Sequence, residues 1–106
     1  MLATAGPQCR IFGNFGVGYN HIDVKKATEL GIWVSNTPGV LTNATADLAW
    51  TLLLAAARRV AEGDRRMRQG VGFEGWGPLY LLGMEVSGKT LGIAGAGRIG
   101  AAMGRR

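Results

Sequence analysis

The first forty residues alternate between short apolar runs and polar, glycine-rich connections. Residues 9–12 and 32–35 are mostly apolar, and each run has the length and composition of a short strand. Residues 24–30 between them predict a helix, with Asp23 as its N-cap and Gly31 as its C-terminal stop. This order of strand, helix and strand predicts a βαβ unit, with parallel strands and a right-handed crossover.

The next segment changes to a helical period. Thr42 or Asn43 can cap a helix that we expect to continue to about Gln69, with Gly70 as its end. Apolar residues with helical spacing, three or four positions apart, are Leu48, Leu52, Ala55, Ala56 and Val60. Trp50, Leu53 and Leu54 widen the apolar surface beyond one stripe. Such a helix is usually buried against a second domain or another subunit, and an ordinary core helix is the alternative.

A glycine motif follows the last apolar run of the chain. Gly88 introduces residues 90–94, which are mostly apolar and predict a buried strand, and residues 99–103 predict the start of a helix. Residues 95–100 between them have the pattern G-x-G-x-x-G. A glycine-rich turn between a strand and a helix is where the pyrophosphate of a dinucleotide binds, because the free N–H groups of the helix hold the anion.

Each glycine of this motif has its own expected purpose. Gly95 allows the tight turn, Gly97 lets phosphates approach the backbone, and Gly100 lets the helix pack close to the strand. With 18 glycines among 106 residues the spacing alone is weak evidence, and residues 70–75 match it as well. That second match comes after a helical pattern and before Trp-Gly-Pro at 76–78, so we expect a loop there.

Composition narrows the class of protein. A hydrophobic fraction of 47% and a charged fraction of 18% are typical of a globular chain, and the length suits one small domain or pieces of two. Much of the positive charge behind the net value of +5 lies in the second half of the long helix, where cations suit the helix dipole. We therefore expect no nucleic-acid partner.

The sequence also bears on the cellular location of the protein and on whether it binds a metal ion. The longest apolar stretch, residues 48–57, is interrupted by Thr51 and is too short to span a bilayer, so no membrane partner is expected. No cationic leader with a cleavage site is recognisable, so we expect a cytoplasmic protein. Cys9 is the single cysteine, which excludes an internal disulfide and a cysteine metal cluster, and we expect no metal site.

Three segments of the chain have distinctive motifs, at residues 14–23 (NFGVGYNHID), residues 36–47 (NTPGVLTNATAD) and residues 88–100 (GKTLGIAGAGRIG). Together these motifs resemble those of the D-isomer-specific 2-hydroxyacid dehydrogenase family. Residues 76–83 (WGPLYLLG) are most similar to the glyoxylate/hydroxypyruvate reductase branch. These motifs follow the family's order and spacing over nearly the whole chain, which is far more specific than one glycine pattern.

The resemblance implies an α/β fold with the Rossmann-like or flavodoxin-like parallel sheets of two adjoining domains, of which this chain is a truncated, internal part. Residues 1–40 are similar to the later strands and a helix of the substrate domain. Residues 41–106 are similar to the linking and dimerisation helix and to the first strand, turn and helix of the NAD(P)-binding domain. In the family, the cofactor cleft lies between the two domains.

The resemblance also implies site residues. The loop at Val17 and Gly18 would offer backbone N–H groups to the substrate carboxylate, since a glycine-rich loop can turn its amides toward an anion. Thr45 matches a position on the nicotinamide side of the cofactor. Arg98 and Ile99 match positions that contact the pyrophosphate, beside the three glycines of the motif. The implied cofactor is NADP or NAD, and the implied substrate is a small 2-oxo or 2-hydroxy acid such as glyoxylate or hydroxypyruvate.

No catalytic residue of the family is matched in this chain. The family's catalytic arginine, glutamate and histidine belong to a later part of the protein, so we expect these residues alone to be inactive. His21 lies in the loop before a predicted helix, and Asp23 and Asp47 are expected at a cap or in a first turn. We therefore expect none of the three to act as a general acid or base.

Two other functions stay open at this point. One is a dinucleotide-binding protein of the corepressor kind, which recruits partners on the same fold, and the other is a protein that only dimerises. The long helix from Asn43 and the glycine- and aromatic-rich residues 71–86 have the apolar and aromatic content of an interface. We expect a homodimer in the full-length protein.

Overall fold

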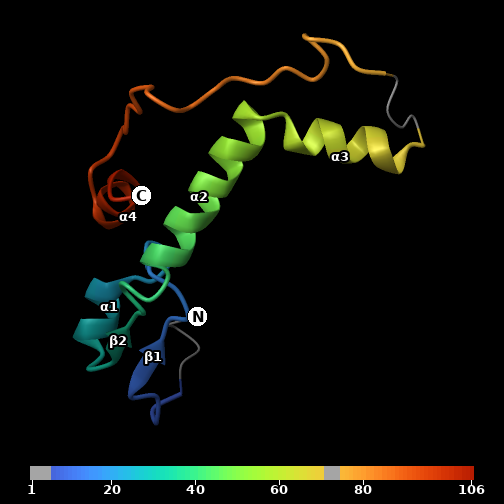
Figure 1. Cartoon of the computed structure of the whole chain (residues 1–106). Coiled ribbons are helices and arrows are strands. Elements are labelled where there is room, and N and C mark those ends of the chain that lie inside the picture. Colours follow the sequence, from blue (N-terminus) through green and yellow to red (C-terminus); the bar gives the residue numbers. More distant parts are fainter. Residues whose placement is uncertain (1–5, 71–74) are drawn as a thin grey trace. The chain divides into compact units, whose positions relative to one another are not determined.

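The computed structural model describes residues 6–70 and 75–106, and Figure 1 colours its elements along the chain. The chain divides into two compact units, Met1–Leu41 and Thr42–Arg106. That the first unit is part of a substrate domain, and the second part of a cofactor domain, stays a prediction.

The first unit contains β1 (Ile11–Gly13), α1 (Val24–Glu29) and β2 (Trp33–Ser35). The two strands pair in parallel, with Phe12 opposite Val34. This pairing confirms the parallel arrangement predicted from the order of strand, helix and strand. The two strands and the helices confirm the α/β class.

Both predicted caps of α1 are present. A side-chain oxygen of Asp23 accepts a hydrogen bond from the Lys26 N–H at 2.9 Å. Gly31 has φ +68°, a conformation that glycine adopts without strain, and the Ile32 N–H then donates to the Ala27 carbonyl at 2.9 Å. Ala27 and Ile32 are both buried, so the cap brings the chain from the helix directly into β2.

The second unit contains α2 (Thr42–Ala57), α3 (Val60–Arg68) and α4 (Arg98–Gly104). α4 packs against α2, and Ala46 of α2 and Ala102 of α4 are completely buried. Small side chains at these positions let the two helix backbones approach closely.

Polar contacts fix the C-terminal end of α4 to the first turns of α2. The Trp50 indole N–H donates to the Met103 carbonyl at 3.1 Å. The Arg106 guanidinium pairs with the Asp47 carboxylate at 2.6 Å and donates to the Asn43 carbonyl at 3.2 Å. The Asp47 carboxylate is therefore part of a structural ion pair.

The prediction of one long helix is wrong, because the helix breaks at Arg59. This residue has left-handed backbone angles, φ 57° and ψ 31°. Its guanidinium donates to both carboxylate oxygens of Glu62, at 2.8 and 2.7 Å, and to the Leu82 carbonyl at 3.3 Å. The Ala57 carbonyl accepts from the Met84 N–H at 2.7 Å. Bonds to a distant segment thus replace helical bonds, although the apolar period continues across the break.

The predicted buried strand at residues 90–94 is also not formed. Leu91 and Ile93 are 43% and 41% exposed, and β1 and β2 form the one sheet found within residues 6–70 and 75–106. A strand needs hydrogen bonds to a neighbouring strand, and the described part of the chain offers none to this segment. The segment is apolar, as the prediction requires, but it is neither paired nor buried within the described residues.

Residues 71–74 lie outside the described residues, and with them most of the second glycine match and part of the predicted interface segment. In the rest of that segment, Trp76 and Leu79 are 85% and 76% exposed. The apolar content expected there is therefore on the surface, while its contact with a partner stays a prediction.

Candidate functional site

The first part of the candidate site is the loop of residues 14–18, which leaves the carboxyl end of β1. The Asn14 N–H continues the strand ladder by donating to the Ser35 carbonyl at 2.8 Å. The Asn14 side-chain amide then turns into the loop and donates to the carbonyls of Gly16 and Gly18, at 3.0 and 2.9 Å. One side chain therefore holds two loop carbonyls.

Residues that follow β2 hold the same loop from the neighbouring strand. The Asn36 side-chain amide donates to the Val17 carbonyl at 2.9 Å, and the Thr37 N–H donates to the Gly16 carbonyl at 3.1 Å. Together with the bonds from Asn14, three consecutive loop carbonyls are engaged. The loop conformation is thus set by donors from the ends of both strands.

This bonding determines where the loop N–H groups point. The Gly16 carbonyl shares a peptide unit with the Val17 N–H, and the Val17 carbonyl shares one with the Gly18 N–H. In a trans peptide the N–H points opposite to the carbonyl, so both N–H groups point away from the donors that hold the carbonyls. Neither N–H donates a hydrogen bond to any residue in the described ranges. Two adjacent donors are therefore available for an anion.

The second part of the candidate site is the glycine turn, residues 95–100. Gly95 has φ +102°, which favours glycine. A Cβ on Gly100 would overlap the Gly95 carbonyl oxygen and would lie 3.3 Å from Cγ2 of Ile93. Gly100 is therefore closely packed, but against the glycine turn itself and the Ile93 side chain, since the strand against which it was predicted to pack is not formed.

Gly97 differs from the other two glycines of the turn. It is the N-cap of α4, with φ −71° and ψ −166°, and a Cβ there would meet nothing within 4 Å. Nothing in the described chain therefore requires glycine at this position, in contrast to Gly95 and Gly100. The next two residues, Arg98 and Ile99, begin α4, and first-turn N–H groups have no acceptor within their own helix.

Thr45 lies in the first turn of α2 and is exposed, next to the buried Ala46. The contacts of Arg106 with Asn43 and Asp47 place this turn beside the C-terminal end of α4. The glycine turn precedes the opposite end of α4. Thr45 and the glycine turn therefore lie on two helices that pack against each other, α2 and α4. No described contact joins Thr45 to the turn itself.

The polar residues set aside in the sequence have structural positions. Asp23 caps α1, Asp47 pairs with Arg106, and His21 is exposed in the turn before α1. Within the described residues, no group of His, Cys, Asp and Glu side chains is arranged to hold a metal ion. Among those residues, none of the helices has the length and apolar character needed to cross a membrane.

Sequence reasoning missed the residues that shape the 14–18 loop. Asn14 and Asn36 belong to the motifs described above, but no role was predicted for either side chain. In the structure, their side-chain amides donate hydrogen bonds to the loop carbonyls. A usable signal was present, because each asparagine directly follows a strand and asparagine favours turns.

Two side chains with shifted pKa values, Arg59 and Glu62, lie away from both parts of the site, between α2 and α3. Hydrogen bonds from Arg59 lower the pKa of Glu62, and the Glu62 carboxylate in turn raises the pKa of Arg59. Both side chains are about 40% exposed, at 39% and 40%, so this pair orders the break between the helices without being buried.

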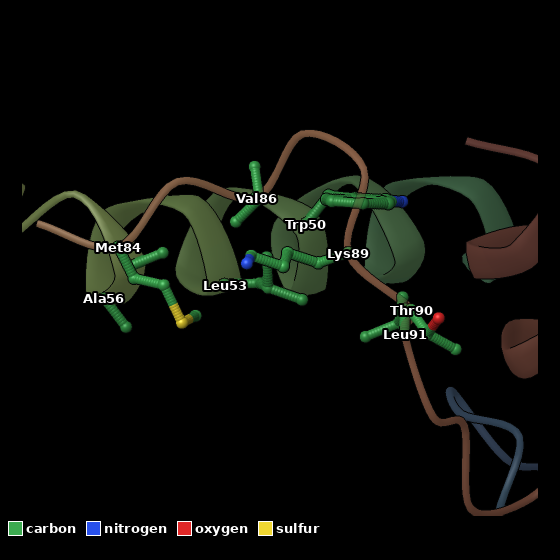
Figure 2. A pocket seen from close by; sticks show the side chains of 9 residues that line it. Trp50, Leu53, Ala56, Met84, Val86, Lys89, Thr90 and Leu91 are labelled. Carbon is green, nitrogen blue, oxygen red and sulfur yellow. The ribbon is translucent and has the colours of Figure 1, made fainter.

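An apolar groove of about 490 Å³ runs along α2 (Figure 2). Figure 2 shows Trp50 and Leu53 of α2 facing the segment that carries Met84, Val86 and Lys89. The groove contains no carboxylate, imidazole or thiol among its lining residues. It therefore offers mainly apolar contact, and Lys89 is the one charged residue among those that line it.

Comparison with known proteins places the chain in a family. The family model for the catalytic domain of D-isomer specific 2-hydroxyacid dehydrogenases matches residues 1–101. A glyoxylate reductase from Korarchaeum cryptofilum is 58% identical over 102 residues, which are 96% of this chain and 31% of that protein. The chain thus spans about a third of the length of the curated relatives that it matches.

Solved structures agree with this match. A crystal structure of a protein from Thermus thermophilus superposes with a TM-score of 0.86 at 49% identity, covering 91% of this chain and 30% of that one. An NADPH-dependent glyoxylate/hydroxypyruvate reductase from Sinorhizobium meliloti, crystallised with citrate, gives a TM-score of 0.72 at 41% identity, again covering 91% and 30%. Because the family model covers nearly all of its residues, the chain belongs to the D-isomer-specific 2-hydroxyacid dehydrogenase family.

Proposed function

We propose that this chain supplies the substrate-carboxylate loop and the pyrophosphate turn of an NAD(P)-dependent oxidoreductase that acts on glyoxylate or hydroxypyruvate. The observation that carries the proposal is the orientation of the 14–18 loop, whose N–H groups at Val17 and Gly18 have no acceptor among the described residues. The names of similar proteins, glyoxylate reductase and glyoxylate/hydroxypyruvate reductase, support the choice of substrate.

The loop suits a carboxylate because it offers two adjacent N–H donors with their carbonyls already bonded elsewhere. A hydrogen bond to a charged group contributes about 1.5–3 kcal/mol, roughly twice the value for a neutral pair. Two such bonds from Val17 and Gly18 would orient a 2-oxo acid by its carboxylate end. The keto group of the 2-oxo acid would then be free to interact with groups outside this loop.

The glycine turn fits a dinucleotide. The space that a Cβ at Gly97 would occupy contains no protein atom within 4 Å. The positive φ of Gly95 and the close packing of Gly100 make the turn tight. The N–H groups of Arg98 and Ile99 would hold phosphate oxygens, and the Arg98 guanidinium would add a positive charge. A bound nicotinamide dinucleotide would supply the hydride that converts a 2-oxo acid into a 2-hydroxy acid.

The proposal includes either form of the cofactor. One similar solved structure is of an NADPH-dependent enzyme, and another is of a formate dehydrogenase that contains NAD. Thr45, exposed in the first turn of α2, is the residue that we propose for the nicotinamide side. The two units would then be parts of a substrate domain and a cofactor domain.

We also propose that the 106 residues alone do not turn over substrate. Proton transfer needs a general acid or base at the keto group, and Asp23 and Asp47 are engaged as a cap and an ion pair. The exposed apolar side chains of Trp76 and Leu79 support a homodimer in the full-length protein. Nothing in the described ranges favours a corepressor-like or dimerisation-only function.

The test is a titration of the purified chain with NADPH and with NADH, following nicotinamide fluorescence with and without glyoxylate. We expect binding without oxidation. In Gly97→Ala the added Cβ meets no protein atom but enters the space proposed for phosphate, so we expect at least tenfold weaker binding, about 1.4 kcal/mol.

Gly92→Ala is the matched control, because a Cβ at Gly92 also meets nothing within 4 Å and Gly92 lies outside the turn. Its binding should equal that of the unchanged chain. Equal affinities for Gly97→Ala and Gly92→Ala would contradict the assignment of the turn to the pyrophosphate, and steady oxidation of NADPH with glyoxylate would contradict the proposed inactivity.

A further inference from the structure

The ends of β1 and β2 place two asparagines next to each other. Gly13 of β1 pairs with Ser35 of β2, and Asn14 and Asn36 are the residues that follow each of them. In a parallel sheet, residues that follow a paired position leave the sheet at the same edge. Both asparagines are partly buried, and both direct their side-chain amides at carbonyls of one loop.

We propose that Asn14 and Asn36 are positioning residues for the substrate carboxylate, because their side-chain amides turn the loop carbonyls inward and thereby present the N–H groups of Val17 and Gly18. This inference rests on the proposed function of the loop. It adds that substrate affinity depends on two side chains that need not touch the substrate.

The chemistry of the amide group explains why asparagine suits these two positions. An amide nitrogen carries two N–H donors, and Asn14 uses its nitrogen for two acceptors, the carbonyls of Gly16 and Gly18. A carboxylate of the same shape has only acceptors. Aspartate at position 14 would repel both carbonyls and attract loop N–H groups instead.

The consequence is a change in the direction of the loop donors. With aspartate at position 14 or 36, the peptide units would rotate so that their N–H groups face the new carboxylate. Those N–H groups would then be occupied from inside the protein. An incoming carboxylate would lose donors without any change in the residues that contact it.

The loop bonds also explain why two asparagines are needed. Asn36 holds the Val17 carbonyl, which sets the Gly18 N–H, while Asn14 and Thr37 both hold the Gly16 carbonyl, which sets the Val17 N–H. Loss of Asn36 should therefore affect mainly the Gly18 donor. Loss of Asn14 should affect the loop more widely, because the Gly18 carbonyl is released as well.

The test uses the 106-residue chain labelled with nitrogen-15, titrated with sodium glyoxylate at constant ionic strength and followed by amide chemical shifts. In the unchanged chain we expect the Val17 and Gly18 amides to shift in a saturable way. Asn14→Asp and Asn36→Asp should raise the apparent dissociation constant at least tenfold, with the largest loss at Gly18 for Asn36→Asp.

Asn20→Asp is the matched control for charge, because Asn20 is exposed in the same segment and makes no hydrogen bond among the described contacts. It adds the same negative charge and should weaken binding less than threefold. Unchanged amide shifts at Phe12 and Val34 establish that the parallel strands persist in each variant. If Asn14→Asp loses the sheet, Asn36→Asp, which removes a single bond, carries the test.

The outcomes separate this inference from the function on which it rests. If the Val17 and Gly18 amides of the unchanged chain do not respond to glyoxylate, the proposed carboxylate loop is wrong. If they respond and both aspartate variants bind as tightly as Asn20→Asp, the loop is right and the positioning role of the asparagines is overturned.

Discussion

Among the glycines of the described residues, Gly100 in α4 is the one where an added methyl group would come nearest to a backbone atom. An alanine Cβ there would overlap the Gly95 carbonyl oxygen and would lie 3.3 Å from Cγ2 of Ile93. The oxygen belongs to the backbone of the glycine turn, so it cannot move aside as a flexible side chain can. We predict that Gly100→Ala forces α4 away from the turn.

Two opposing contributions set the size of this effect. Alanine is favoured over glycine inside a helix by about 1 kcal/mol. Overpacking against fixed atoms costs about 1–3 kcal/mol, and the overlap with the Gly95 oxygen places this contact at the upper end. The free energy of unfolding of the second unit should therefore fall by roughly 1–2 kcal/mol.

Urea unfolding followed by helical circular dichroism measures the change. Gly104→Ala is the control within the same helix, since its Cβ would lie 3.9 Å from Cδ1 of Ile93, an ordinary contact. The control should be as stable as the unchanged chain or slightly more stable. A Gly100→Ala chain that unfolds at the same urea concentration as Gly104→Ala would refute the close approach of α4 and the turn.

Three further changes test other contacts. Trp50→Phe removes the indole donor to the Met103 carbonyl and should cost about 1 kcal/mol in urea unfolding. Gly83→Ala would place a Cβ 2.5 Å from a backbone oxygen at the end of α2, so the free energy of unfolding should fall by about 1–3 kcal/mol. Because Arg59 lowers the pKa of Glu62 from the usual 4.5, the pair stabilises the fold above that pH and its contribution is lost as the pH falls. Glu62→Gln should therefore melt at a lower temperature than the unchanged chain at neutral pH, and the difference should shrink as the pH falls below 4.5 and the Glu62 carboxylate takes up its proton.

Local chemistry made α1 and the glycine turn predictable. The carboxylate of Asp23 caps the helix and the positive φ of Gly31 ends it, as the residue types indicate. The order of strand, helix and strand then fixed parallel pairing. At the turn, Gly95 has the positive φ that a tight turn requires, as expected, whereas Gly100 packs against the turn instead of the predicted strand.

The errors occurred where distant segments decide local structure. Arg59 adopts a left-handed conformation, which is unfavourable for arginine, with its side chain bonded to the Leu82 carbonyl and to Glu62. The apolar spacing across this point is the same as in a continuous helix. Only the return of the chain to the end of α2 reveals the break.

The 14–18 loop shows the same limit at the candidate site. Its motif predicts that Val17 and Gly18 bind a substrate carboxylate, but the direction of each N–H depends on which carbonyls Asn14 and Asn36 hold. That choice follows from the pairing of Gly13 with Ser35, which the sequence alone does not specify. Thr45 and the glycine turn likewise share a unit only because α4 packs on α2.

The proposal that one chain holds both a carboxylate and a dinucleotide can be tested in a single nitrogen-15 amide titration, with NADPH added first and glyoxylate second. The account predicts that NADPH shifts the amides of Arg98 and Ile99, and that glyoxylate then shifts those of Val17 and Gly18. Shifts spread evenly over the chain, or confined to residues outside the loop and the turn, would contradict it.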